Sequence, residues 1–184
     1  MSSFSKAYAQ DVIAQLSLEE SNRALADHWL SLWDGDALPP RAKFNPAKMK
    51  PFLANIIMFN VVPNRSVMVR LAGTGFRHFL DSELTGGDWI GLAPKSHRAT
   101  RLKLFTSIAR GAILVAHRLV AMTVGADYIS EEILLPFAPD ASGSTPVLVH
   151  VNFKPEHFLK IKSMAQVTGD PLDFQLVPLA QPTA

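Results

Sequence analysis

Apolar side chains recur at helical spacing in the first part of the chain. Residues 5–34 are predicted to be helical because such side chains return every three or four positions. The clearest stripe consists of Leu25, Trp29, Leu32 and Trp33. Ser17 and Glu20 have the spacing of a capping box, in which two side chains satisfy backbone N–H groups at a helix start. A break near Ser17 would divide this stretch into two helices.

Prolines separate the helical stretch from the rest of the chain. Their positions within residues 36–51 exclude a continuous helix or a central strand, because proline lacks a backbone N–H group. A short helical turn from Pro46 to Met49, with Asn45 as its cap, is compatible with this pattern. Residues 36–51 are therefore expected to be a connector.

Five runs of β-forming residues follow the connector. They cover residues 55–62, 67–72, 113–122, 128–137 and 147–153. A four-residue turn separates the first two runs, which predicts an antiparallel hairpin. An amphipathic stretch at 94–110, introduced by Pro94 and ended by Gly111, predicts a helix between the second and third runs.

This order of elements predicts an α+β fold. We expect a five-stranded antiparallel sheet with crossover helices on one face, extended by the N-terminal helices. The expected units are an N-terminal extension over residues 1–36, a sheet-forming domain over 37–155, and a C-terminal segment over 156–184. The C-terminal segment has no strong period and ends in a proline-rich stretch, so part of it is expected to be flexible.

Composition narrows the classes of function. The 184-residue chain has no cysteine, which excludes disulfides, thiolate metal sites and cysteine nucleophiles. A net charge of +2 gives no reason to expect nucleic acid as a partner. Only 18% of the residues are charged, against ~25% in typical domains, so an exposed apolar patch and self-association are expected.

Neither a signal peptide nor a membrane span is predicted. The first residues, MSSFSKAY, lack the apolar segment that a signal peptide contains. No apolar run approaches the ~20 residues that a spanning helix requires. We therefore expect a cytoplasmic protein.

Several motifs resemble bacterial PAS domains. Residues 69–76 (VRLAGTGF), followed by 83–86 (ELTG) and the Asp88-Trp89 pair, look like the second strand, crossover and turn of those domains. The segments upstream are similar to a subgroup of stand-alone PAS proteins found largely in alphaproteobacteria; they are Trp29, residues 38–42 (LPPRA), 44–46 (FNP) and the run through Phe59.

The resemblance covers roughly residues 25–155. It implies a PAS fold and a sensory role. Most members of the subgroup have no assigned ligand, so the resemblance supplies no site and no cofactor.

A small-molecule pocket in this layout would lie between the sheet and the crossover helices. The side chains expected near it are Arg70, Thr74, Phe76, Phe79, Trp89, Phe105, His117 and Tyr128. For the aromatic members, packing in the core is the simpler interpretation. Arg70 differs because it lies within a strand, where an inward side chain would need an anionic partner or ligand.

Two packing arrangements are open to the apolar stripe formed by Leu25, Trp29, Leu32 and Trp33. It can pack on the chain's own sheet, or it can pair with the same helix of a second copy in a two-fold contact. PAS domains often dimerise through flanking helices, so the resemblance favours a homodimer that uses this stripe. A separate signalling protein is also expected as a partner, because 184 residues leave no room for a kinase or cyclase domain.

Two other functions remain open. The predicted second helix carries a basic cluster with no acid between Asp88 and Asp127, which would suit a phosphate-bearing second messenger. The cluster comprises Lys95, His97, Arg98, Arg101, Lys103 and Arg110. The other alternative is a cone-shaped α+β isomerase or cyclase with an inward acid–base pair, which the clustering of acids in turns disfavours.

The remaining motifs do not indicate catalysis. Gly73-Thr-Gly75 is an incomplete dinucleotide loop, because His78 occupies the position of the third glycine. The histidines lack metal-ligand spacing. Some haem-binding PAS domains carry their axial ligand where His97 lies, yet a lone helical histidine is more often a surface residue. Adjacent Glu131 and Glu132 point to opposite faces of a strand and cannot act as a pair. We expect a sensor that is not an enzyme.

Overall fold

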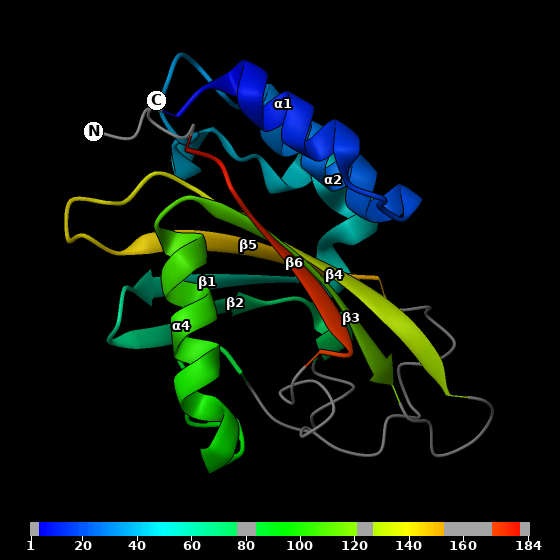
Figure 1. Cartoon of the computed structure of the whole chain (residues 1–184), viewed down its shortest axis with the longest axis vertical. Helices are drawn as coiled ribbons and strands as arrows, with labels where there is room; N and C mark the ends of the chain where they lie inside the picture. The colour runs from blue at the N-terminus through cyan, green and yellow to red at the C-terminus, as the bar shows by residue number, and fades with distance from the viewer. Residues whose placement is uncertain (1–3, 77–83, 121–126, 153–170, 181–184) are drawn as a thin grey trace.

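Helices cover both faces of a central sheet in the computed structural model (Figure 1). The structure describes residues 4–76, 84–120, 127–152 and 171–180. Helices α1 (Lys6–Gln15) and α2 (Glu20–Ser31) lie across one face of the sheet. Helix α4 (Arg98–Ala109) follows the 3₁₀ turn η3 (Lys95–His97) and packs on the opposite face. The predicted second helix is confirmed by η3 and α4.

Within the described residues, six antiparallel strands form one sheet in the order β2-β1-β5-β4-β3-β6. The strands are β1 (Ile56–Val62), β2 (Ser66–Ala72), β3 (Ala112–Val120), β4 (Tyr128–Pro136), β5 (Thr145–Val151) and β6 (Asp173–Pro178). Strands β1 to β5 overlap the five predicted runs, with starts and ends that differ by at most two residues, and β1 and β2 form the predicted hairpin. Positions 121, 122 and 153 of those runs lie outside the described residues. The prediction of an α+β fold with an antiparallel sheet is confirmed.

Alternate residues of the central strands enter two separate cores. In β1, Ile56 and Met58 pack beneath α1 and α2, whereas Ile57 and Phe59 pack beneath α4. Every residue of β5 is buried because helices cover both of its faces. The α4 side matches the predicted crossover face, and the N-terminal helices cover the other face.

The N-terminal stretch breaks near Ser17 as predicted, but its capping differs. Helix α2 begins at Glu20 without a side-chain cap, so the predicted capping box does not form. Arg23 instead reaches back from α2 and donates hydrogen bonds to the carbonyl groups of Ile13 and Leu16, at the end of α1. A cation is favourable there because the carbonyl end of a helix carries partial negative charge.

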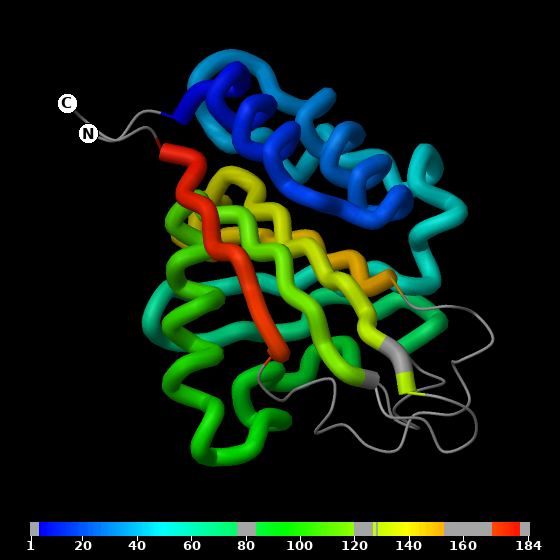
Figure 2. Tube along the Cα trace, turned by 45° about the vertical axis from the view of Figure 1, so that its right-hand side comes forward, coloured from blue at the N-terminus to red at the C-terminus, as the bar shows by residue number. Residues whose placement is uncertain are grey.

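The connector forms two 3₁₀ segments before the sheet begins. These are η1 (Arg41–Lys43) and η2 (Pro46–Asn55). The predicted cap is confirmed, because Asn45 Oδ1 accepts a hydrogen bond from the Ala47 N–H at 2.9 Å. Figure 2 shows this connector running from the helices down to β1.

Strand β6 was not predicted from the sequence. It pairs with β3 from Ala112–Pro178 to His117–Asp173, so residues near the chain end belong to the sheet. Leu179 is fully buried against the N-terminal helices, and Ala180 pairs with Phe4. The β6 sequence DFQLVP is largely apolar, which is compatible with a strand. The flanking prolines nevertheless suggested a frayed segment. The segment is held by a strand partner distant in sequence, which a local pattern does not reveal.

Candidate functional site

A small cavity lies between α4 and the sheet. It has a volume of about 40 Å³, which is room for about three water molecules. Its apolar wall includes Ile57, Phe59, Phe76, Trp89, Phe105 and Leu134. The rings of Trp89 and Phe105 both contact Phe59, at centroid separations of 5.1 Å. We call this space the α4 cavity.

Three charged side chains also line the α4 cavity. Arg118 in β3 donates from Nε and Nη2 to Glu132 Oε1 in β4, at 2.9 and 2.7 Å. These two side chains are only 12% and 10% exposed, so the ion pair is largely buried. Arg101 in α4 places its guanidinium carbon 5.5 Å from the centre of the Trp89 ring. The cavity therefore combines an aromatic, aliphatic wall with a few fixed polar groups, as ligand pockets do.

The predicted pocket residues lie in different places. Phe76, Trp89 and Phe105 line the α4 cavity. Arg70 and Thr74 are exposed, and Arg70 borders a groove on the opposite face of the sheet. Phe79 lies outside the described residues, as does the side chain of Tyr128 at the start of β4.

His117 lies on the face that carries the N-terminal helices and does not line the cavity. It is paired in register with Glu131, whose side chain contacts α2. Because successive strand residues point to opposite faces, its neighbour Arg118 is the residue that enters the cavity.

The charged residues of the α4 cavity were missed from the sequence. Arg118 and Glu132 each lie in a strand that is mostly apolar, next to His117 in β3 and Glu131 in β4, and this was the available signal. A charge within a buried strand requires a partner, and here the two strands supply partners to each other. Arg101 was predicted only as a member of the basic cluster on the second helix, whereas its side chain is buried, at 6% exposure.

A buried polar chain lies on the other face of the sheet, between α2 and the strands. Asn22 Nδ2 donates to Glu131 Oε1 at 2.7 Å, and the Glu19 backbone N–H donates to the same oxygen at 2.9 Å. His150 Nδ1 lies 2.6 Å from Asn22 Oδ1. Burial lowers the pKa of His150 to about 4, so its ring is neutral at pH 7 and donates from Nδ1 to Asn22.

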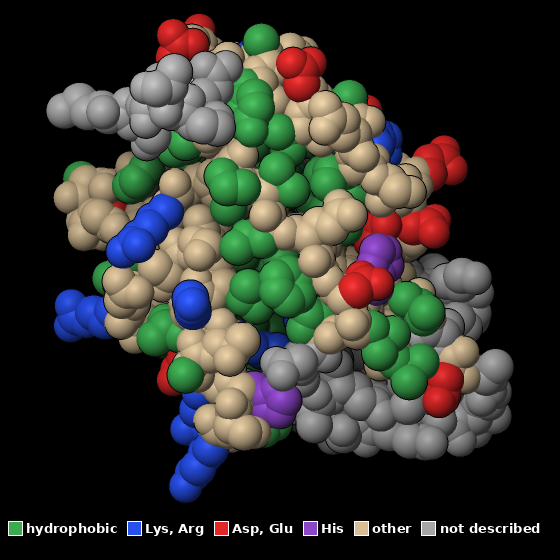
Figure 3. All heavy atoms as spheres, in the orientation of Figure 1, with side chains coloured by type: hydrophobic (Ala, Val, Ile, Leu, Met, Phe, Trp, Pro, Cys, Tyr) green, Lys and Arg blue, Asp and Glu red, His purple; other side chains and the backbone are tan. Residues whose placement is uncertain are grey.

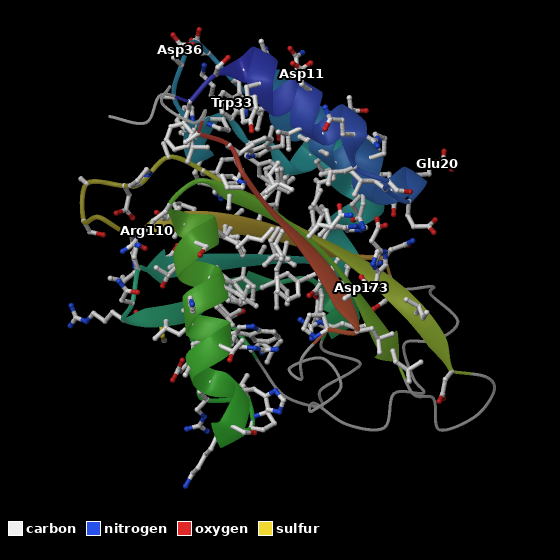
Figure 4. The ribbon with its side chains drawn as sticks, in the orientation of Figure 1. Asp11, Glu20, Trp33, Asp36, Arg110 and Asp173 are labelled. Atoms are coloured by element: carbon white, nitrogen blue, oxygen red, sulfur yellow. The ribbon has the colours of Figure 1, made fainter. Side chains whose placement is uncertain are left out.

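His117 extends this polar chain toward the sheet edge. Its Nε2 lies 3.5 Å from Glu131 Oε2, and its Nδ1 lies 2.7 Å from Asp173 Oδ1 in β6. Burial alone would lower the pKa of His117, but the hydrogen bond and charge of Asp173, together with Glu131, raise it. In Figure 4, Asp173 marks the start of β6, and Glu20 marks the start of α2. We call this series of side-chain contacts, which joins His150, Asn22, Glu131, His117 and Asp173, the helix-face network.

The basic residues near α4 do not form one uniform surface. Arg98 donates to the carbonyl groups of Ala93 at 3.0 Å and Gly91 at 2.6 Å, which fixes the turn before the helix. Arg101 is buried in the cavity wall. Lys and Arg side chains still project around this side of the molecule in Figure 3. Arg98 and Arg101, both members of the predicted basic cluster, therefore have structural roles within the chain.

The stripe predicted for dimerisation packs within the chain. Leu25, Trp29 and Trp33 are buried in the core beneath the N-terminal helices, and Leu32 packs against it. Trp29 donates from Nε1 to the Pro136 carbonyl oxygen of β4 at 3.0 Å. A dimer that used this stripe would require α2 to leave the sheet.

The part of the chain that the structure describes lacks a metal-binding cluster and a membrane-spanning helix. Within it, no cluster of three or more histidine, aspartate and glutamate side chains could hold a metal ion. None of its helices is long and apolar enough to cross a membrane.

Comparison with known proteins identifies one family. A family model described as PAS domain matches residues 18–150, which is more than half of the chain. The match begins just before α2 and ends within β5, so it includes the residues that line the α4 cavity except Val151 and Pro171. No curated protein matches the chain.

Proposed function

Since the chain belongs to the PAS domain family, we propose that it is a sensory module that binds a small molecule in the α4 cavity. PAS domains are generally sensory and interaction modules without catalytic activity. We propose the same for this chain, and we assign the described side chains roles in binding and in transmitting a change of packing.

The observation that supports ligand binding most strongly is the Arg118–Glu132 pair. A buried ion pair contributes little to stability, because the cost of removing both charges from water offsets their attraction. Yet this pair lies in the wall of an otherwise apolar cavity, with Arg101 and Trp89 nearby. Fixed polar groups in an apolar pocket orient a ligand by its hydrogen-bonding end.

The volume of the cavity limits how a ligand would enter. About 40 Å³ is far below the roughly 300 Å³ at the lower end of ordinary ligand pockets. A ligand larger than a few waters would have to displace α4 or rearrange Arg118 and Glu132. Occupancy would therefore change the packing of α4, which is the kind of event that a sensor transmits.

We propose that the change reaches the N-terminal helices through β4. Glu132 faces the α4 cavity, and the adjacent Glu131 binds Asn22 and the start of α2 on the other face. A displacement of this part of β4 acts on both faces together. A second copy of the chain or a signalling protein would then read the position of α1 and α2.

Native mass spectrometry of protein purified from cells tests the binding proposal, together with an absorption spectrum. We expect a retained small molecule that is released on denaturation, or a library compound that raises the Tm. The Arg118→Met/Glu132→Met double variant removes both charges at similar volume and should lose this response. The matched control is Arg65→Met, which replaces an exposed arginine in the β1–β2 turn.

Two results would contradict the proposal. One is a wild-type protein that retains nothing and gains no Tm from any library compound. The other is a ligand that the double variant binds as tightly as the wild type, which would move recognition away from the ion pair.

A further inference from the structure

A second groove lies on the face of the sheet opposite the α4 cavity. The connector forms one side of it, and strands β1 and β2 form the floor and the other side. Its volume is about 180 Å³, larger than that of the α4 cavity. Phe44, Ile56 and Met58 supply a buried apolar floor, and the exposed side chain of Leu71 borders it. We call this space the connector groove.

A β-bulge places Arg70 at the connector groove. Met58 pairs with Leu71, and Phe59 pairs with Val69, so Arg70 is the extra residue with no partner position in β1. A bulge turns one side chain out of the regular alternation, and bulges are frequent at sheet edges beside binding sites. Strand β2 is an edge strand of this sheet. The bulge therefore explains why a strand arginine borders a groove on this face.

Arg41 supplies the second guanidinium of the groove from η1. Its Nε atom is buried and makes no hydrogen bond within the part of the chain that the structure describes. A buried N–H group without an acceptor is unfavourable, so this atom provides a donor for a ligand oxygen. Arg41 lies in the stretch that the sequence predicts to be a connector, and the structure places it in the lining of the groove.

The described lining of the groove contains two arginines and no carboxylate. Among the described acids, Asp140 in the β4–β5 turn interacts electrostatically with Arg70. Its carboxylate accepts hydrogen bonds from the Ser142 hydroxyl and from the backbone N–H groups of Ser142 and Ser144. The groove thus combines positive charge at its border with an apolar floor.

We propose that the connector groove binds an amphipathic monocarboxylate. The carboxylate would accept hydrogen bonds from Arg41 and Arg70, since guanidinium groups match carboxylates in geometry and charge. The apolar chain would lie on Phe44, Met58 and Leu71. A volume of about 180 Å³ suits a short acyl chain better than a nucleotide, because drug-sized ligands occupy roughly 300–1,000 Å³.

Titration with sodium octanoate tests this site, with acetate and 1-octanol as probes that lack the chain or the charge. We expect octanoate to bind, acetate and octanol to bind at least tenfold more weakly, and Arg41→Ala and Arg70→Ala each to weaken octanoate at least tenfold. Arg65→Ala is the matched control, because it removes an exposed arginine from the same hairpin. Arg41→Lys and Arg70→Lys keep the charge and should show intermediate affinity.

Nuclear magnetic resonance separates this site from the α4 cavity. Octanoate in the connector groove should shift the Met58 methyl signal and leave the Trp89 indole signal unchanged. The proposal is wrong if octanoate fails to bind at millimolar concentration, or if octanol binds equally well. It is also wrong if folded Arg41→Ala and Arg70→Ala bind octanoate like the wild type, or if only the Trp89 signal moves. A shift of the Trp89 signal alone would place octanoate in the α4 cavity, because Trp89 lines that cavity. The other results concern the connector groove and leave the α4 cavity proposal standing.

Discussion

Asn22 of α2 and Glu131 of β4 join the N-terminal helices to the sheet through a hydrogen bond of 2.7 Å. Both side chains are buried, and Glu131 also accepts the Glu19 backbone N–H at the start of α2. A carboxylate at this end of a helix is favourable, because the free N–H groups there carry partial positive charge. The N-terminal helices are thus fixed to the sheet by polar contacts as well as by apolar packing.

Replacing Asn22 tests the strength of this attachment. Asn22→Ala leaves the His150 N–H without its acceptor and removes a donor from Glu131, so we expect the free energy of unfolding to fall by about 2 to 4 kcal/mol. Urea denaturation measures the change. The exposed Asp27→Ala on the same helix should change it by less than about 0.5 kcal/mol. Equal effects of the two substitutions would contradict the structural role of Asn22.

His150 should make the protein sensitive to acid. Burial depresses its pKa from 6.5 in the unfolded chain to about 4, so protonation favours unfolding. The contribution of neutral His150 to the free energy of unfolding is complete above pH 6.5 and decreases as the pH falls toward 4. The total decrease corresponds to about 3 kcal/mol.

Urea denaturation from pH 7.5 to 4 measures this dependence. His150→Gln keeps a side-chain donor but cannot titrate, so its stability should vary less over the interval. An identical pH dependence in the variant and the wild type would show that another group is responsible.

His117 should respond to pH in the opposite sense. Its pKa is raised because Asp173 and Glu131 outweigh the effect of burial. The stabilisation from protonated His117 is therefore complete below pH 6.5 and is lost as the pH rises through the raised pKa. A proton NMR titration should give His117 a pKa above 6.5, and Asp173→Asn should lower this pKa.

His28 provides an internal reference for the same titration. Burial, with a smaller contribution from the charge of Lys48, lowers its pKa, so it should titrate below 6.5 in both proteins. A His117 pKa that does not change in Asp173→Asn would remove Asp173 as the main partner.

Trp29 should act as a core residue of the single chain. It is fully buried and donates to the Pro136 carbonyl. Trp29→Phe loses the hydrogen bond and should cost about 1 to 3 kcal/mol, whereas Trp29→Ala should cost about 3 to 5 kcal/mol. Light scattering on the folded Trp29→Phe protein should give the wild-type mass. A loss of dimer mass without a loss of stability would instead support the predicted helix pairing.

Gly111 should not tolerate a side chain. Its φ of +96° is strained for other residues, and a Cβ atom would overlap the ring of Phe4. Gly111→Ala is expected to cost at least about 1 to 3 kcal/mol from backbone strain. Adding Phe4→Ala removes the overlap, so the double variant should be more stable than the sum of the two single losses predicts. Additive losses would show that the ring does not limit this position.

Local patterns predicted most of the secondary structure. Strands β1 to β5, the helix after Pro94 and the Asn45 cap all depend on residues close in sequence, so alternation and capping chemistry were sufficient. Strand β6 depends on pairing with β3, which lies more than fifty residues earlier. The hydrogen bond at the start of α2 likewise depends on Glu131, which lies more than one hundred positions from its donor, the Glu19 backbone N–H.

The candidate site was predicted in its apolar part only. Phe76, Trp89 and Phe105 were identified because aromatic residues near a crossover helix pack on the sheet. Arg118 and Glu132 were missed because their pairing across β3 and β4 depends on the register of the two strands. A shift of one residue along a strand moves a side chain to the opposite face of the sheet. His117 and its neighbour Arg118 therefore lie on opposite faces.

An insertion or deletion within β3 or β4 would disrupt both faces of the sheet at once. Residues 117 and 131 serve the helix-face network, while 118 and 132 serve the α4 cavity, in strict alternation. Losing a single residue from either strand would invert the pattern and put each charged pair into the wrong environment. Point substitutions can change one face and spare the other. Diversification of this strand pair is therefore restricted to exchanges of side chains at constant length.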